Sequence, residues 1–487
     1  MTANRLGLAI LLLFGSAEPP ILQAGVQKLV PHDGADQDRF GRGVAVDGDI
    51  IVIGAAYDDD LGTSSGSAYV FERDGFGVWA FSQKLTAATG APSDFFGEDV
   101  DIQNNTLVVG AEQHGKGAVF VFERSPSGPW QEVATLEPTD PQNGGDFGQT
   151  VEIDGGVLAV GRSGFANKMG AVHVFERDPT GSWVGVARLQ ASDGQARDLL
   201  GDAIAVSNDV VVAGAWEANS GSGSAYVFRR DPSTGTWQEE QKLVAPGPPD
   251  WDQFGVSVDV DGDLILVGAI SEESTEADTG AAYVFAYDSA LQSWSQEAKL
   301  IAEDTRAGSE FGSAVALDGG RALVGAAPGD GCDLTSGAAY LFQRDPVGRD
   351  WALMEKRQAF DGQSDDGFGL SLDLDEGTMV VGASGHSYLS VGSGAVYVNP
   401  PVVNIAPYGF GCGGSGGLIP RLSITGCPVA GGLLNIYAAC ALGGATGILF
   451  ASSSSRQVPL GGGCSLFPIS ILAAFPFGFG GAGAGGG

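Results

Sequence analysis

The feature that most constrains this chain is a motif that recurs seven times between residues 40 and 382. A Phe-Gly pair opens six copies, and Leu200-Gly201 opens the fourth. In every copy another glycine follows the Phe or Leu at the same offset of 14 residues. The pairs begin at Phe40, Phe96, Phe147, Leu200, Phe254, Phe311 and Phe368, and the later glycines are Gly54, Gly110, Gly161, Gly214, Gly268, Gly325 and Gly382. Such self-similarity is the signature of a repeat architecture.

Each unit contains four segments that are typical of β-strands. Two apolar segments flank a tight turn, as in residues 43–55, where Asp47-Gly48 supplies residue types that accept positive φ in a hairpin. A third segment follows, such as residues 66–71, and a fourth begins at a Trp six residues before a Leu, as in residues 79–85. Four strands per unit, repeated radially, predict an all-β fold, a seven-bladed β-propeller.

The first and last units predict how the ring closes. The seventh unit, residues 368–398, has three strand-like segments and stops before Pro400-Pro401. A spare fourth-strand segment, residues 26–29, precedes the first unit, and Leu29 lies 11 residues before Phe40, as Leu85 lies before Phe96. We therefore expect the N-terminal segment to pair into the seventh blade, because closure removes the exposed edge of an open array.

Two different segments flank the predicted propeller of residues 25–400. Residues 1–24 are predicted to be a secretory signal peptide, with Arg5 before an apolar run and small residues near Ala17 and Ala24 for cleavage. Residues 401–487 are Gly-rich and predict a small β domain, either whole or truncated, with two disulfides. Its cysteines are Cys412, Cys427, Cys440 and Cys464, and Cys332 is left without an assigned partner.

The charge balance limits the partners of the chain. There are 25 Lys and Arg residues against 59 Asp and Glu residues, a net charge of −34. This surface would repel nucleic acid and anionic membranes. The apolar run at 466–479 is short and interrupted by prolines, so no membrane span is expected in the mature chain. We expect a monomeric propeller that is secreted or held at the cell surface.

The repeated units resemble FG-GAP repeats, which build integrin α-subunit propellers and many bacterial surface and secreted proteins. The Phe-Gly and Gly-Ala elements carry the resemblance, with V-D-G-D between them at residues 46–49, and it covers residues 28–399. It implies a seven-bladed propeller and, by analogy of fold, adhesion or the binding of proteins and carbohydrates. The family's calcium loop is missing, because a two-residue turn at Asp47-Gly48 cannot supply six to eight oxygen ligands.

Binding residues are expected where loops depart from the sevenfold pattern. The loops before the first strand and between the second and third strands should open on one face. Trp216 and Trp251 lie outside the repeated Trp position and are candidate anchors for a protein or sugar, with local loop packing as the alternative. Acidic residues of these loops are candidates for ligand binding or Ca²⁺, with a solvated acidic loop as the alternative. They are Asp58, Asp59, Asp60, Glu272 and Glu273.

Two further sets of carboxylates recur in the units. One set stands two residues before the Phe or Leu, as at Asp38 and Asp94, and its repetition favours capping of the turn over an acidic binding ring. The other set shares one position of the first strand and predicts a cation site, with Ca²⁺ as the candidate ion, if it lines the central channel. Its members are Asp101, Glu152, Asp259 and Asp373. If buried, these groups need partners or raised pKa values.

The inventory of catalytic groups is small. The histidines His32, His114, His173 and His386 stand apart, and none shares a recognisable motif with Ser, Cys or a carboxylate. The sequence therefore predicts an extracellular binding or adhesion propeller that recognises a protein or carbohydrate and has no catalysis of its own. A polysaccharide hydrolase or lyase, and a structural component of the cell surface or matrix, remain as alternatives.

Overall fold

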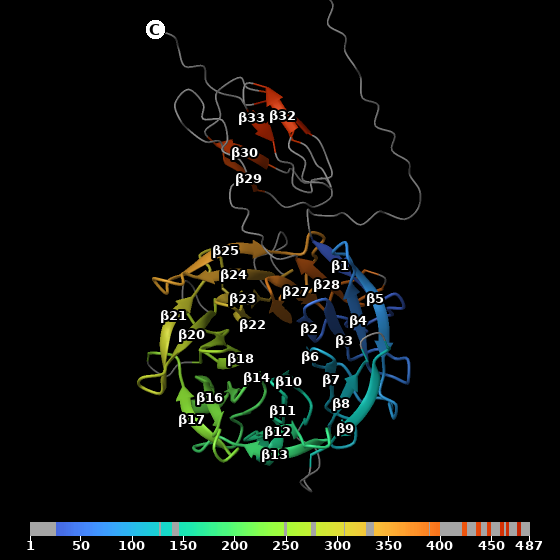
Figure 1. Ribbon diagram of the computed structural model, residues 1–487, viewed down its shortest axis with the longest axis vertical. Helices are drawn as coiled ribbons and strands as arrows, with labels where there is room; N and C mark the ends of the chain where they lie inside the picture. The colour runs from blue at the N-terminus through green and yellow to red at the C-terminus, as the bar shows by residue number, and fades with distance from the viewer. Residues whose placement is uncertain are drawn as a thin grey trace, which may run out of the picture.

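The computed structural model is a ring of seven four-stranded antiparallel sheets around a central channel, so the predicted seven-bladed all-β propeller is confirmed (Figure 1). The structure describes residues 26–399 with gaps, and six strands between residues 421 and 478. The gaps are residues 126–127, 139–145, 248–250, 274–278, 306, 328–335 and 389.

In the first three blades the strands follow chain order from the channel outward, as Figure 1 shows. The first blade contains β2 (Val44–Asp47), β3 (Ile50–Ala55), β4 (Ser67–Arg73) and β5 (Trp79–Leu85). The second contains β6 (Val100–Gln103), β7 (Thr106–Ala111), β8 (Ala118–Glu123) and β9 (Gln131–Leu136). The third contains β10 (Val151–Asp154), β11 (Val157–Gly161), β12 (Val172–Arg177) and β13 (Trp183–Leu189).

The next three blades repeat this order. The fourth contains β14 (Ile204–Ser207), β15 (Val210–Ala215), β16 (Ser224–Arg230) and β17 (Trp237–Leu243). The fifth contains β18 (Phe254–Asp261), β19 (Leu264–Ala269), β20 (Ala281–Asp288) and β21 (Ser293–Leu300). The sixth contains β22 (Phe311–Asp318), β23 (Arg321–Ala326), β24 (Ala338–Arg344) and β25 (Trp351–Arg357). Two one-turn helical segments, α1 (Phe165–Lys168) and α2 (Ala218–Gly221), lie between the second and third strands of the third and fourth blades.

The seventh blade is built from both ends of the propeller. Its strands are β26 (Leu372–Asp375), β27 (Thr378–Ala383), β28 (Ala395–Asn399) and, outermost, β1 (Gln27–Leu29). Strand β1 pairs antiparallel with β28, with Lys28 opposite Tyr397. The predicted closure by the N-terminal strand is therefore confirmed.

A side-chain amide also joins the closing strand to the first blade. The Gln27 Nε2 donates to the backbone O of Trp79 at 2.6 Å, and the Trp79 N donates to Gln27 Oε1 at 2.8 Å. Gln83 makes the same pair of bonds with Trp130, in the next blade. The contact that joins β1 to the first blade is therefore the same as the contact between the first and second blades.

The recurring glycines allow successive blades to approach each other closely. A Cβ built on Gly54 of β3 would lie no more than 2.5 Å from the carbonyl oxygen of Gly97, the glycine of the next Phe-Gly pair. Real Cβ contacts do not occur below 3.0 Å. The same approach occurs at all seven junctions, including Gly382 against Gly41 at the point of closure. Only glycine fits there, which explains the fixed offset in the sequence.

The apolar core lies between the blades. One cluster of buried side chains joins Val52 and Val70 of the first blade to Leu107 and Phe120 of the second. Phe96 of the second Phe-Gly pair is fully buried and meets the Phe120 ring edge-on, with the centroids 5.4 Å apart. The second and third strands of a blade, such as β3 and β4, are thus covered on both faces and are apolar on both sides, while the outer strand, such as β5, is partly exposed.

Six further strands are described after the propeller, as three antiparallel pairs. They are β29 (Arg421–Thr425) with β30 (Asn435–Ala439), β31 (Thr446–Leu449) with β34 (Phe475–Gly478), and β32 (Val458–Gly461) with β33 (Cys464–Leu466). The predicted signal peptide and the disulfide pairing lie outside the described residues. Among the described residues no helix has the length and apolarity to cross a membrane.

The glycine junctions generate a prediction about stability. In Gly268→Ala the new Cβ would overlap the carbonyl oxygen of Gly312. We therefore expect the free energy of unfolding to fall by about 1–3 kcal/mol or more. Gly75→Ala is the control, because nothing lies within 4 Å of a Cβ there. Chemical denaturation of both variants checks this. Equal stability of the two variants would contradict the close-approach account.

Candidate functional site

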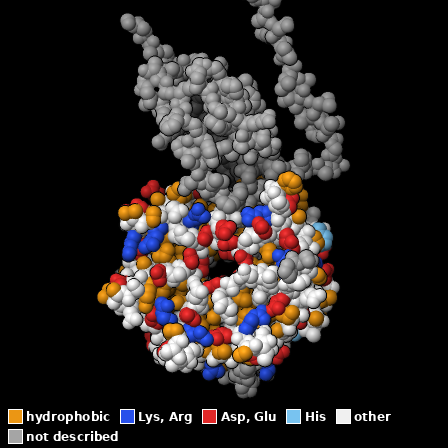
Figure 2. Space-filling view, in the orientation of Figure 1, with side chains coloured by type: hydrophobic (Ala, Val, Ile, Leu, Met, Phe, Trp, Pro, Cys, Tyr) orange, Lys and Arg blue, Asp and Glu red, His pale blue; other side chains and the backbone are white. Residues whose placement is uncertain are grey.

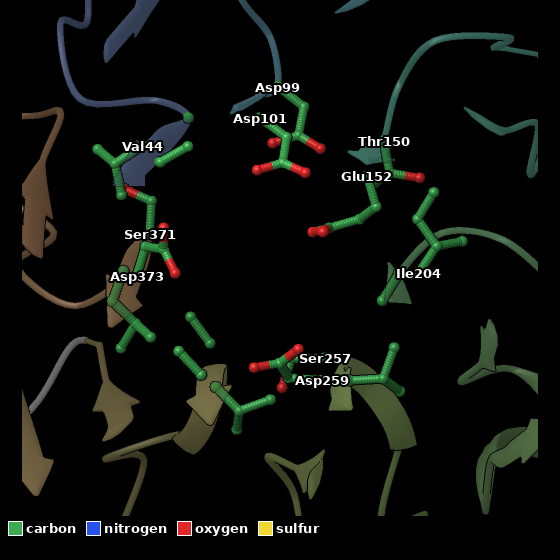
Figure 3. A pocket seen from close by; sticks show the side chains of 18 of the residues that line it. Val44, Asp99, Asp101, Thr150, Glu152, Ile204, Ser257, Asp259, Ser371 and Asp373 are labelled. Atoms are coloured by element: carbon green, nitrogen blue, oxygen red, sulfur yellow. The ribbon is translucent and has the colours of Figure 1, made fainter. Parts of the chain in front are cut away.

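The central channel is a polar cavity of about 260 Å³ lined by the inner strands of all seven blades. Side chains alternate along a strand, so every second residue of an inner strand faces the axis. The predicted set of four carboxylates does line this channel, together with Asp99 (Figure 3). Figure 2 shows acidic side chains around the central opening.

Three of the four carboxylates bond to the neighbouring blade. In each case one carboxylate oxygen accepts the backbone N–H of the next residue in the chain, and the other accepts a backbone N–H of the next blade's inner strand. The inter-blade bonds join Asp101 to Ile153, Asp259 to Leu317 and Asp373 to Val46. These aspartates therefore tie the ring together around its axis.

The fourth carboxylate, Glu152, extends toward the centre of the channel (Figure 3). Burial, and then repulsion from Asp101 and Asp259, raises its pKa well above the ordinary value. Burial is also the main cause that raises the pKa of Asp259 and of Asp373 to about 7. The channel therefore loses protons and gains negative charge near neutral pH.

The channel carboxylates do not converge on a common point. Within the described ranges, no group of three or more His, Cys, Asp or Glu side chains is placed to hold a metal ion. The observed task of Asp101, Asp259 and Asp373 is hydrogen bonding to backbone. A cation site in the channel stays a prediction.

The turns between first and second strands form a second belt around the ring. At six junctions an oxygen from one blade's turn accepts a backbone N–H from the next turn, as Asp375 does from Gly48 at 2.7 Å. The other five pairs are Asp47 with Asn104, Asp154 with Asn208, Ser207 with Gly262, Asp261 with Gly319, and Asp318 with Gly377. At the remaining junction, Gln103 donates to Asp154. This face is therefore committed to holding the blades together.

The aspartates before the Phe-Gly pairs cap their turns, as the repetition predicts. Each is buried and accepts the backbone N–H of the residue three positions earlier. The bonds are Ala35 to Asp38, Ala91 to Asp94, Gln195 to Asp198 and Gln363 to Asp366, at 2.6–2.7 Å. Capping is confirmed for these four.

Most of the predicted acidic loop residues have internal partners. Asp58 and Asp60 lie 2.8 and 2.6 Å from the Lys84 Nζ, and an oxygen of Asp59 accepts the backbone N–H of Ser64. Glu272 pairs with Lys299 at 2.5 Å, and Glu273 is exposed. In two of these loops, a lysine side chain therefore pairs with the carboxylates for which the sequence suggested a metal ion.

A recurring Tyr–Lys pair lies behind these loops, and the sequence analysis missed it. In five blades a Lys on the outer strand stands over the ring of a Tyr on the third strand, 5.0–5.6 Å from its centroid. The pairs are Lys84–Tyr69, Lys242–Tyr226, Lys299–Tyr283, Lys356–Tyr340 and Lys28–Tyr397. An aspartate seven residues before the Phe or Leu bonds the Lys in four blades: Asp33, Asp193, Asp304 and Asp361. The repeated Gln-Lys-Leu at 27–29, 83–85 and 241–243 was the signal that could have revealed it.

Two histidines that the sequence sets apart are adjacent to carboxylates in space. His114 Nδ1 lies 2.8 Å from Asp94, and His386 Nδ1 lies 2.6 Å from Asp366. The His386 Nε2 is also 2.7 Å from the Nζ of Lys28, whose pKa is lowered by burial. The side chains of His386 and Lys28 are buried, so the cluster locks the closing strand to its blade.

The two candidate tryptophans have different surroundings. The Trp216 Nε1 donates to Asp202 Oδ2 at 2.7 Å and the ring is partly buried, which is the local packing alternative. Trp251 is 65% exposed and lies over Gly221, where a Cβ would come within 2.5 Å of the indole Cε3. Of these two tryptophans, Trp251 is therefore the accessible one.

The channel generates a prediction about pH. The pKa of Glu152 is higher in the folded chain than in the unfolded chain, where it is about 4.3. As the pH rises from the unfolded pKa through the folded pKa, ionisation of Glu152 therefore lowers the stability of the native state. We expect Glu152→Gln to raise Tm by about 1–3 °C at pH 8 and to have little effect at pH 4. Exposed Asp36→Asn is the control. A gain at pH 4 equal to that at pH 8 would contradict the assignment.

Solved structures that this chain resembles include an enzyme. A protein from Lactobacillus plantarum is similar at 15% identity and a TM-score of 0.45, covering 65% of this chain and 84% of that one. A periplasmic gluconolactonase from Pseudomonas aeruginosa is similar at 16% identity and a TM-score of 0.46, covering 65% and 85%. The prediction that this chain is not an enzyme is therefore corrected, because proteins of similar fold include a lactonase. At this distance the likeness carries no argument for lactonase activity here.

The sequence comparisons identify the repeat. A search of curated proteins finds no match. The model of the FG-GAP repeat family matches seven segments, which together span well over half of the chain. They are residues 24–71, 79–122, 130–175, 183–228, 237–285, 294–342 and 351–399. Each of the seven begins with the outer strand of one blade and ends with the third strand of the next, which is the offset that closes the ring. The chain belongs to the FG-GAP repeat family.

Proposed function

We propose that this chain is an extracellular binding propeller that holds a protein or carbohydrate ligand on the face opposite its turn belt. Membership of the FG-GAP repeat family and the net charge of −34 support a protein that works outside the cytoplasm. Residues 1–24, which have the features of a secretory signal peptide, also support export.

On one face of the ring the polar groups join neighbouring blades, and on the other face the loops can contact a ligand. The turns between first and second strands bond to one another around the ring, as Asp375 does to Gly48. Strand register places the loops before the first strands at the opposite end, because Phe254 pairs with Ala269 while Asp261 pairs with Leu264 at the turn. Ligand contacts therefore fall on the second face, where the loops vary.

The observation that carries the proposal is the exposure of Trp251. Large aromatic side chains dominate the energetics of binding sites when a ligand covers them. Of the eight tryptophans, all of them within the described residues, only Trp251 is largely exposed. It lies in the loop before β18, on the variable face, and it occurs in one blade only.

This proposal predicts the effect of a single substitution. On an array of extracellular proteins and glycans, we expect Trp251→Ala to weaken binding at least about ten-fold, because a covered indole contributes about 2 kcal/mol or more. Phe76→Ala is the matched control, since Phe76 is 95% exposed in the β4–β5 turn at the other face. Loss of binding in the control alone would place the ligand on the turn face and refute the proposal.

A further inference from the structure

We infer that Trp251 and the cavity beside it form a subsite for a neutral carbohydrate. This inference rests on the proposed binding function and names its ligand class. The cavity has a volume of about 350 Å³ and lies between the loop before β14 and the segment α2. That volume is at the lower end of the range for small-molecule sites, which suits one or two sugar rings.

Trp251 and the cavity share one short segment of the chain. Asn219 and Ser220 of α2 line the cavity, and the next residue, Gly221, lies under the Trp251 indole. The backbone N–H of Gln253 donates to the carbonyl oxygen of Gly221 at 3.0 Å, which fixes the aromatic loop against α2. Trp251 does not itself line the cavity; Asn219, Ser220 and Gly221 of α2 connect the two, so a ligand that extends over α2 reaches both.

The lining of the cavity suits hydroxyl groups. Donors and acceptors stand together in it, with Arg197 and Gln195 beside Glu217 and Asn219. A sugar hydroxyl both donates and accepts, so it can use such a mixture fully. The buried centre of a protein–protein interface is instead depleted of charged residues. A polar cavity and an exposed indole that are joined by one short segment therefore favour an oligosaccharide, one ring of which packs its C–H face on the indole while the hydroxyls of the next ring enter the cavity.

The charges of the site indicate which sugars fit. Five charged side chains line the cavity: Arg197 and Lys242 against Asp193, Asp198 and Glu217. Lys242 is paired with Asp193 at 2.7 Å, and Asp198 caps the backbone of Gln195. The local balance is close to neutral, while the whole chain carries −34. Anionic glycans are therefore repelled at long range and gain no cationic pocket in return.

The arrangement occurs in a single blade. Trp251 stands three residues before Phe254, and the described residues at that offset in other blades are Gln37, Ser93, Arg197, Gly308 and Asp365. In the first blade, Gln37 covers Gly392 in the way that Trp251 covers Gly221. The arrangement of the loop therefore recurs, but an aromatic residue occupies this position in one blade only.

Quenching of tryptophan fluorescence by acrylamide tests the subsite in the full chain. Because Trp251 is the exposed tryptophan, quenching reports mainly on its surface. The probes are neutral oligosaccharides of glucose, galactose, mannose and N-acetylglucosamine, with trigalacturonate as the anionic counterpart. We expect at least one neutral sugar to reduce quenching at saturation and trigalacturonate to have no effect.

Variants separate the subsite from a general effect on folding. Calorimetric titration with the protective sugar should show binding lost in Trp251→Ala, retained within about three-fold in Trp251→Phe, and weakened at least about five-fold in Arg197→Ala. Phe76→Ala should bind as the unchanged protein does. Circular dichroism confirms that each variant is folded.

The outcomes distinguish this inference from the proposed function. If no neutral sugar protects Trp251 while a protein ligand needs it, the sugar subsite is wrong and the binding face stands. If trigalacturonate protects Trp251 as well as a neutral sugar does, the charge argument is wrong. If every ligand binds equally to the unchanged protein and to Trp251→Ala, both proposals fail.

Discussion

The structure depends on the contact between a glycine of one blade and the carbonyl group of the next. At each junction a second-strand glycine, such as Gly54, faces the glycine of the following Phe-Gly pair, and a side chain there would overlap the carbonyl oxygen. The close approach seals the apolar core between sheets, with Phe96 fully buried at the junction. Because all seven junctions are alike, the last blade must meet the first, and β1 supplies the strand that completes it.

Groups that repeat around the ring serve the scaffold, and groups that do not repeat are available for a ligand. Channel aspartates such as Asp101 hold the next blade's backbone, although burial raises their pKa values and makes ionisation costly. The Tyr–Lys pairs and the capping aspartates also make contacts within the scaffold. Against this background, Trp251 stands out because only one blade carries it.

Much of the fold could be predicted from the sequence because its signals are local. The 14-residue offset and the position of Leu29 before Phe40 predict the blade number and the closure. The bond from Asp101 to the Ile153 backbone was not predictable in this way, because the partner belongs to another blade and is an atom common to every residue. The contact of His386 with Lys28 joins residues at opposite ends of the propeller, which no spacing reveals.

The candidate site could be predicted only in outline. Departure from the repeat identified both Trp216 and Trp251, but exposure separates them, and exposure depends on the loops around each ring. Asp58 and Asp60 suggested a cation, and the sequence did not show that Lys84, on a different strand, occupies that place. The absence of a catalytic motif was also too weak a basis for excluding an enzyme, because catalytic groups that a fold brings together need not be close in the sequence.

The most direct test of the closed ring is hydrogen–deuterium exchange measured by mass spectrometry on the full chain. If β1 completes the seventh blade, the backbone amides of residues 27–29 and 396–398 that bond across the β1–β28 pair will exchange slowly, as amides of the interior strand β16 do, and only the outward-pointing amides of β1 will exchange fast. If residues 27–29 exchange at the rate of an unstructured peptide while β16 stays protected, the ring is open at this point and the account of closure is wrong.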